Sequence, residues 1–204
     1  MTSNRASGYS AQTGSFDPAN QRTSGMGNLG PAPPLQRRED NSPEEQCNEL
    51  EKKVGALIDE SAILAKEGDL GQALEKAKEA GKRERMLCKQ REQLNLSEQI
   101  NIDLTYAVHF NLAVQFQNNG LYTEALNTYS LIVRNTQYAQ SGRLRVNMGN
   151  IYAAQTKYLL AVKMYRKALE EIPSAGKELR FKIMRNIGHA FVKLAQYKDA
   201  IGTH

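Results

Sequence analysis

The chain has 204 residues, of which 40% are hydrophobic and 24% charged, and its formal net charge is +5 at pH 7. This length suits one domain with a tail, and the absence of an apolar run of about 18 residues or of an apolar N-terminal segment predicts neither a membrane span nor a signal peptide. Cys47 and Cys88 lack a CxxC partner and the three histidines are not grouped with possible ligands. We therefore expect reduced, intracellular thiols and no metal site.

Residues 1–43 are predicted to form a disordered tail. They contain five of the six prolines and many Ser, Gly, Asn and Gln residues, but few bulky apolar ones. Such a segment buries too little apolar surface to offset the conformational entropy lost on ordering. The sequence Ser42-Pro43-Glu44-Glu45 predicts the first helix start, because it offers a capping serine, a proline in the first turn and acids near the positive helix end.

Residues 44–100 are predicted to form a helical hairpin that turns near Gly68. No proline occurs between Glu44 and Ile172, and Ala, Leu, Glu, Lys and Gln dominate, which permits continuous helix. The second helix is expected to be long and charged and to end near Leu94. We expect this length to set the hairpin apart from the rest of the chain.

Residues 101–204 carry a repeated pattern, which predicts three repeats of 34 residues at about 106–139, 142–175 and 181–204, the last incomplete. The repeats agree at positions 7, 8, 11, 15, 17, 20 and 24. In the first repeat these positions hold Leu112, Ala113, Phe116, Gly120, Tyr122, Ala125 and Tyr129, and in the second Met148, Gly149, Tyr152, Thr156, Tyr158, Ala161 and Tyr165. In the third they hold Ile187, Gly188, Phe191, Ala195, Tyr197, Ala200 and the terminal His204. This period and signature are those of the tetratricopeptide (TPR) repeat, a helix-turn-helix unit.

The spacing has a physical basis. Positions 8 and 20 are small because two antiparallel helices approach each other there, the large apolar positions fill the space around that contact, and position 15 makes the turn. We therefore predict an all-α, TPR-type solenoid with a disordered N-terminal tail. The first helix of the array is expected to be capped by Ser97 or Asp103.

The hairpin at 44–100 fits the repeat less well. With Ala73 at position 20, Ser61 falls at position 8, but Glu60 occupies position 7, where a large apolar residue is expected. The third repeat stops at His204, so we expect a turn near Ala195 and an unfinished second helix. It would expose apolar residues at a solenoid edge and make the chain associate unless a partner covers them. These residues are Ile187, Phe191, Leu194 and Ile201.

No nucleophile–base arrangement, phosphate-binding loop or metal-binding motif occurs in the sequence. His109 falls at a packing position and His189 at a position that faces the inner groove. We therefore predict no enzyme, no catalytic residue and no cofactor.

The first helices of the repeats are expected to line a partner-binding groove. The groove residues predicted from repeat positions are Phe110, Val114, Asn118, Arg143, Asn150, Lys182, Arg185, His189 and Lys193. Residues 101–204 hold 13 Lys and Arg against six Asp and Glu. Apolar and basic residues together suit a peptide with apolar anchors and acidic flanks, whereas the alternative is that this face packs against further repeats. Nucleic acid is not expected, because the tyrosines fall on packing positions instead of alternating with exposed cations.

A peptide-binding co-chaperone or adaptor is the alternative function. TPR co-chaperones hold a C-terminal carboxylate with five Lys, Asn and Arg residues. Here Asn147 and Lys182 match that set, whereas Phe110, Val114 and Asn186 do not. The sequence therefore favours this alternative less.

Three segments resemble a particular family: DLTYAVHFNLAVQFQNNGLYTEALNTY, QYAQSGRLRVNMGNIYAAQTKYLLAVKMYRKALEEIP and MRNIGHAFVKLAQYKDAI. They resemble the polaris family, the large TPR subunit of intraflagellar transport complex B, over about residues 44–203. The resemblance implies a non-enzymatic scaffold that joins other complex B subunits, acts indirectly with kinesin and dynein motors, and is needed to build cilia. It implies a location at the cilium, basal body and centrosome and in the cytoplasm, without membrane insertion. Members are far longer, so the resemblance implies that this chain is truncated.

Overall fold

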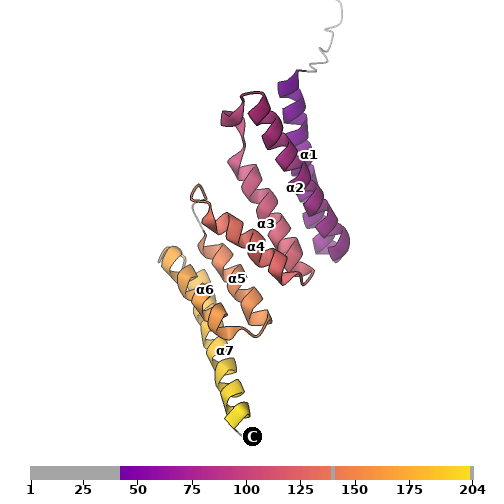
Figure 1. Cartoon of the computed structure of the whole chain (residues 1–204). Coiled ribbons are helices and arrows are strands. Elements are labelled where there is room, and N and C mark those ends of the chain that lie inside the picture. The colour runs from indigo at the N-terminus through magenta and orange to yellow at the C-terminus, as the bar shows by residue number, and fades with distance from the viewer. Residues whose placement is uncertain (1–41, 139–140, 203–204) are drawn as a thin grey trace, which may run out of the picture. The chain divides into compact units, whose positions relative to one another are not determined.

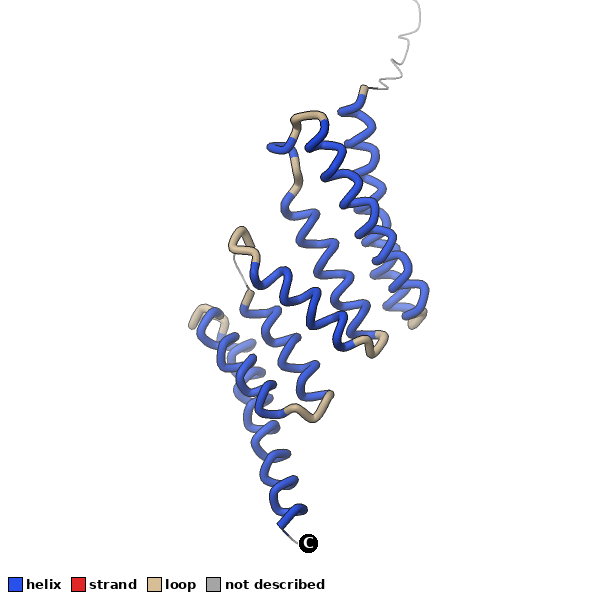
Figure 2. Tube along the Cα trace, in the orientation of Figure 1, coloured by secondary structure: helices blue, strands red, loops and turns tan. Residues whose placement is uncertain are grey.

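The computed structural model describes residues 42–138 and 141–202, with side chains up to Gln196, and its regular structure is helical throughout. In chain order the elements are α1 Pro43–Glu67, α2 Leu70–Gln93, the 3-10 turn η1 Ser97–Gln99, α3 Ile102–Asn118, α4 Tyr122–Arg134, α5 Gly142–Ala154, α6 Tyr158–Glu171 and α7 Lys177–Gly202. Helices pair as α1 with α2, α3 with α4 and α5 with α6, and the pairs stack in chain order, as Figures 1 and 2 show. This confirms the predicted all-α solenoid. Of the disordered tail predicted at residues 1–43, residues 1–41 lie outside the described residues, whereas Ser42 and Pro43 already belong to the start of α1.

The first two helices begin and end where the sequence predicts. The Ser42 hydroxyl oxygen accepts a hydrogen bond from the Glu45 backbone N–H (3.1 Å), and Pro43 opens α1. Gly68 ends α1 with a φ of 93°, a left-handed conformation that glycine adopts without steric cost. Asp69 then caps α2, which runs to Gln93 and so confirms the predicted end near Leu94.

The cap expected for the next helix was wrong. Helix α3 is capped by Asn101 instead of Ser97 or Asp103. The side-chain oxygen of Asn101 accepts a hydrogen bond from the Leu104 N–H at 3.0 Å. Asn101 also donates its amide to Glu51 of α1 at 2.7 Å. The hydrogen bond with Glu51 therefore favours Asn101 as the cap, and local sequence preferences do not indicate this contact.

The expectation that the first hairpin stands apart was also wrong, because α2 packs directly against α3. Asn111 of α3 donates to Ser61 of α1 at 3.0 Å, and Thr105 donates to Glu84 of α2 at 2.6 Å. Although α2 is rich in charge, it keeps an interior stripe that includes Ala80 and Leu87. The charges lie on the remaining faces, so a charged helix is still amphipathic.

The small residues of the repeats lie where helices meet. Ala113 and Ala125 are fully buried in the first repeat, and the Ser61 hydroxyl donates directly to the Ala73 carbonyl at 2.8 Å in the degenerate hairpin. Gly149 instead faces Tyr165: a Cβ atom built on this glycine would lie 2.5 Å from a carbon of the tyrosine ring. Position 8 is therefore small for packing reasons in every hairpin described.

The third repeat does not form the expected turn near Ala195, because α7 continues without interruption from Lys177 to Gly202. The earlier turns use Gly120 (φ 72°) and Thr156 (φ 60°), both left-handed. Alanine strongly disfavours that conformation and has the highest helix propensity, so the helix continues. The predicted edge residues Ile187 and Leu194 are only half-buried, whereas Phe191 is 45% exposed.

Two glycines at the same repeat position provide a matched test of this packing. Gly149→Ala is expected to lower the free energy of unfolding by about 1–2 kcal/mol, because displacing the buried Tyr165 ring outweighs the gain in helix propensity. Gly188→Ala should raise it by up to about 1 kcal/mol, because a Cβ there has no atom within 4 Å. Urea unfolding followed by circular dichroism measures both, and equal effects of the two substitutions would contradict the packing described.

Candidate partner-binding face

The first helices of the three repeats, α3, α5 and α7, border a hollow of about 830 Å³. Its lining residues are Tyr106, Phe110, Arg143, Val146, Asn147, Ala175, Gly176, Lys177, Glu178, Leu179 and Lys182. The hollow thus has an aromatic wall from α3 and cations from α5 and α7. Three of the nine predicted groove residues line it: Phe110, Arg143 and Lys182.

Most groove residues predicted from the two earlier repeats pack or form hydrogen bonds within the chain. Phe110 and Val114 pack against the core cluster of α3, α4 and α5. Asn150 accepts a hydrogen bond from the Tyr165 hydroxyl at 2.8 Å, and exposed Asn118 contacts Gln115. Of these four, Phe110 alone also lines the hollow.

The predicted residues on α7 lie outside the hollow, apart from Lys182. Arg185 and His189 are exposed farther along the helix, and Lys193 is half-buried. The sequence prediction missed Tyr106 and Lys177. Tyr106 stands at repeat position 1, which was not among the positions used to predict the groove. Lys177 opens α7 just before the third repeat window.

Positive charge dominates this hollow. Arg143, Lys177 and Lys182 line it, and its only acidic lining residue is Glu178, which forms an ion pair with Lys182 at 2.6 Å. The hydrogen bond and charge of Lys182 hold the pKa of Glu178 below its usual value, so this carboxyl is ionised at neutral pH. Two cations are left to meet an acidic ligand.

Arg143 stands between two hollows. A second hollow of about 640 Å³ adjoins the first and shares Arg143, Ala175, Gly176 and Leu179 with it. Its other lining residues are Tyr138, Ser141, Gly142, Glu171, Ile172 and Pro173. The exposed guanidinium of Arg143 is therefore accessible from both sides.

Hydrogen bonds between helix ends fix the walls of these hollows. Glu171 at the end of α6 accepts from both Ser141 and Arg145 at 2.6 Å, which holds the start of α5. Arg180 of α7 donates to the Leu169 and Ile172 carbonyls at 2.7 and 2.8 Å. These bonds satisfy carbonyls at the end of α6 and position the first turn of α7.

Asparagines at repeat position 6 join successive hairpins. Asn111 donates to Ser61 (3.0 Å), Asn147 to the Tyr129 hydroxyl (3.2 Å) and Asn186 to Asn150 (3.4 Å). A carboxylate clamp would need the side chains at this position free for a ligand. Here they hydrogen-bond to the preceding hairpin, which weighs against the clamp.

The titratable groups in the interior are poorly suited to catalysis. Burial, with the Glu84 carboxylate beside it, raises the pKa of Cys88 to about 12, so this thiol stays protonated and is a weak nucleophile at neutral pH. Burial also raises the pKa of Tyr129 to about 12. Within the described residues no group of three possible metal ligands occurs, and no helix there has the length and hydropathy of a membrane span.

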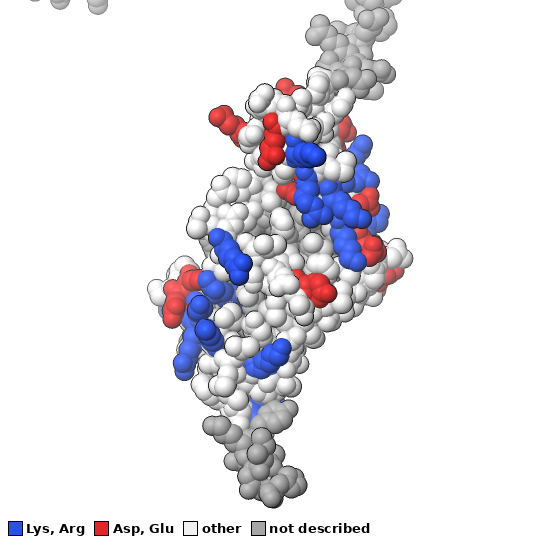
Figure 3. Space-filling view, in the orientation of Figure 1, with Lys and Arg blue, Asp and Glu red and all other residues white. Residues whose placement is uncertain are grey.

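Surface charge differs between helices on the face shown in Figure 3. The cations over α2 stand among acidic side chains and form pairs such as Lys78–Glu75 and Arg83–Glu79. A second group of cations lies over α6, whose exposed basic residues include Lys163 and Arg166. These two α6 residues do not line either hollow described above, which makes them suitable controls for charge.

Comparison with known proteins identifies a protein that is similar over the whole chain. No protein-family model matches the chain. The chain is 50% identical over 207 residues to the human intraflagellar transport protein 88 homolog, in an alignment that covers 100% of this chain and 24% of that relative. The chain therefore spans about a quarter of the relative's length. This similarity confirms the resemblance found from the sequence.

Proposed function

We propose, starting from this similarity to an intraflagellar transport protein, that the chain is a non-catalytic scaffold that joins other complex B subunits and so serves cilium assembly. It would act at the cilium and basal body, also at the centrosome, and meet kinesin and dynein motors only through its partners. Two observations support this proposal: the identity extends over the whole chain, and its stacked hairpins present a basic hollow with an aromatic wall.

The hollow favours a particular kind of partner segment. Tyr106 and Phe110 stack with ring centroids 6.0 Å apart and offer an apolar wall. Arg143 and Lys177 supply positive charge that no acidic side chain of the described residues pairs with. A peptide with an aromatic or aliphatic anchor and acidic neighbours complements both features. We infer that a complex B subunit binds here through such a segment.

Charge reversal in the hollow tests this function. Arg143→Glu/Lys182→Glu is expected to weaken binding to purified complex B subunits at least about tenfold, measured by co-elution and fluorescence anisotropy. Lys163→Glu/Arg166→Glu makes the same change in charge on α6, outside the hollow, and should bind like the wild type. Equal loss in both variants would mean that only net charge matters and that the hollow is not the site.

The co-chaperone alternative has one observation in its favour, because Asn147 and Lys182 both line the hollow. It predicts binding of an acidic peptide that ends in a free carboxylate, and loss of that binding when the peptide is amidated. The scaffold proposal instead predicts that amidation has no effect.

A further inference from the structure

Three cations and a methionine share one exposed face in the second half of α2. Lys82, Arg85, Met86 and Lys89 stand at helix positions i, i+3, i+4 and i+7, a spacing that places them on the same side of the helix. All four are exposed, and 62% of the Met86 surface is accessible to solvent. Helices α1 and α3 pack on other faces of α2, so neither covers this one. We call these four residues the α2 stripe.

The first half of α2 pairs its charges, whereas the α2 stripe does not. Lys78 pairs with Glu75 and Arg83 with Glu79, at spacings of three and four residues. In the stripe the same spacings place cation beside cation, and none of its three cations forms an ion pair within the described residues. Like charges at these spacings oppose helix formation. An anionic ligand on the stripe would relieve that repulsion.

The charge of the surrounding hairpin limits the size of such a ligand. Figure 3 shows cations gathered over α2, yet residues 44–100 as a whole hold ten Lys and Arg against 13 Asp and Glu. A membrane or a nucleic acid presents negative charge over an extended surface and would meet those acids as well as the stripe. Attraction therefore requires a ligand whose negative charge is local, such as a short acidic segment of a protein.

The shape of the surface favours a segment that is helical. The α2 stripe lines neither of the two hollows described above. An extended peptide is bound in a groove or along a sheet edge, whereas a helix satisfies its own backbone hydrogen bonds and can lie on another helix. Seven residues of helix rise about 10 Å, so a second helix presents side chains at matching intervals. The flexible side chain of Met86 can fill the space between them.

We propose that the α2 stripe docks an acidic helix of a partner protein. Carboxylates spaced three and four residues apart on that helix pair with Lys82, Arg85 and Lys89, and an apolar residue between them contacts Met86. The stripe shares no residue with the hollow bordered by α3, α5 and α7. The proposal therefore does not depend on the function proposed for that hollow, and different substitutions test the two surfaces.

Two synthetic peptides test the proposal on the full 204-residue chain. Both are fluorescent, alanine-rich helices of about 25 residues with equal numbers of glutamates and leucines. The striped probe carries its glutamates along one face, at spacings of three and four, and the dispersed probe carries them around the helix. At physiological salt, where charges more than about 8 Å apart are screened, fluorescence anisotropy should show at least about tenfold tighter binding of the striped probe.

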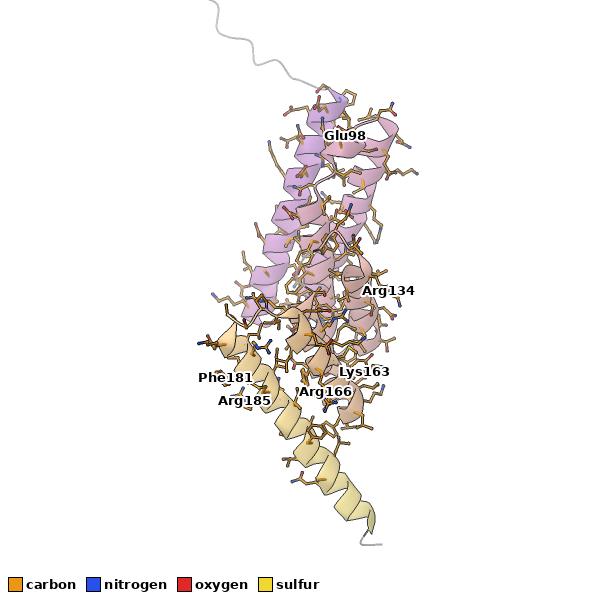
Figure 4. All side chains as sticks on the ribbon, turned by 90° about the vertical axis from the view of Figure 1, so that its left-hand side faces the viewer. Glu98, Arg134, Lys163, Arg166, Phe181 and Arg185 are labelled. Atoms are coloured by element: carbon orange, nitrogen blue, oxygen red, sulfur yellow. The ribbon has the colours of Figure 1, made fainter. Side chains whose placement is uncertain are left out.

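Matched charge reversals then locate the contact. Lys82→Glu/Lys89→Glu should weaken the striped probe at least about tenfold, and the fold is retained because both residues are exposed and Lys and Glu have similar helix propensities. Figure 4 shows Lys163 and Arg166 on α6, two hairpins farther along the chain. Lys163→Glu/Arg166→Glu makes the same change in charge there and should bind the striped probe like the wild type.

A neutral substitution separates the apolar contact from the charges. Met86→Gln keeps the side-chain length and the helix propensity but replaces the thioether with an amide, so it should weaken the striped probe about threefold. Arg143→Glu/Lys182→Glu, in the hollow, should bind the striped probe like the wild type.

Several results would each overturn the proposal. Equal binding of the two probes would mean that net charge alone acts, and loss of binding in Arg143→Glu/Lys182→Glu would place the probe in the hollow. Co-sedimentation with phosphatidylserine vesicles that Lys82→Glu/Lys89→Glu abolishes would identify a membrane surface as the occupant. In sedimentation of the chain alone, a dimer that the same α2 variant converts to monomer would identify a second copy of the chain.

Discussion

Replacing Tyr129 with alanine is expected to lower the free energy of unfolding by about 3–5 kcal/mol, which is the cost of emptying a large buried aromatic site. Tyr129 is fully buried between α3, α4 and α5, and its ring meets the edge of Phe110 at a centroid distance of 6.5 Å. Its hydroxyl donates to Gln117 and accepts from Asn147. The substitution therefore removes both core volume and the bond that joins two successive hairpins.

Urea unfolding of the purified chain measures this effect. Leu131→Ala, two residues away on α4 at a position 60% exposed, is the matched control and should change stability by no more than about 0.5 kcal/mol. Tyr129→Phe keeps the ring and loses the hydroxyl, at a cost of about 1 kcal/mol. A small effect of Tyr129→Ala would mean that α4 and α5 do not share one core.

Glu51→Ala is expected to cost about 3 kcal/mol, because it leaves a buried arginine without a counter-ion. The Arg91 side chain is 4% exposed and pairs with Glu51, whose side chain is 27% exposed, at 2.5 Å. Glu51 also accepts from Asn101, the cap of α3, so this carboxylate joins α1, α2 and α3. Among the described residues the Arg91 Nε already lacks a hydrogen-bond partner, which leaves little to offset the loss of Glu51.

Thermal or urea unfolding compares this variant with two others. Glu51→Ala/Arg91→Met should recover most of the stability, because no unpaired buried charge remains. Glu49→Ala removes an exposed carboxylate of the same helix, whose ion pair with Lys52 is screened by solvent, so it should leave the unfolding transition nearly unchanged. If Glu51→Ala costs no more than Glu49→Ala, the first hairpin is not joined to the array through this pair.

The Glu51–Arg91 pair also predicts that the free energy of unfolding depends on pH. Burial opposes the charge of Glu51, but hydrogen bonds from Asn101 and Arg91 outweigh it and hold the pKa of Glu51 below its usual 4.5. When folding lowers the pKa of a carboxyl group, the group stabilises the folded state fully at pH values above its unfolded-state pKa. This contribution to the free energy of unfolding is lost as the pH falls through the folded-state pKa. The wild type and Glu51→Ala should therefore differ most at neutral pH and converge in acid below about pH 4.

Much of the fold can be predicted from the sequence because the hairpin signals are local. Small residues such as Ala113 and Ala125 and the turn at Gly120 lie within one repeat, and so do the contacts that they make. The cap at Asn101 was missed because Glu51, fifty residues earlier, stabilises it. The continuous α7 was missed because repeat periodicity placed a turn at Ala195 although that residue favours helix.

The candidate site was predicted only in part, for a related reason. Repeat position indicates which face of a helix a residue occupies, and three of the residues chosen in this way, Phe110, Arg143 and Lys182, line one hollow. It does not indicate how deep that face lies, so Val114 was assigned to the groove although it packs on the core. Nor does it describe the segment between α6 and α7, where Gly176 lines both hollows.

Affinity purification of the tagged chain from ciliated cells, followed by mass spectrometry, tests the proposed scaffold function most directly. The account predicts that other complex B subunits co-purify with the wild type and with Lys163→Glu/Arg166→Glu, and that Arg143→Glu/Lys182→Glu depletes them. Recovery of chaperones in place of those subunits, lost in the Arg143→Glu/Lys182→Glu variant, would contradict the account and identify a chaperone cofactor.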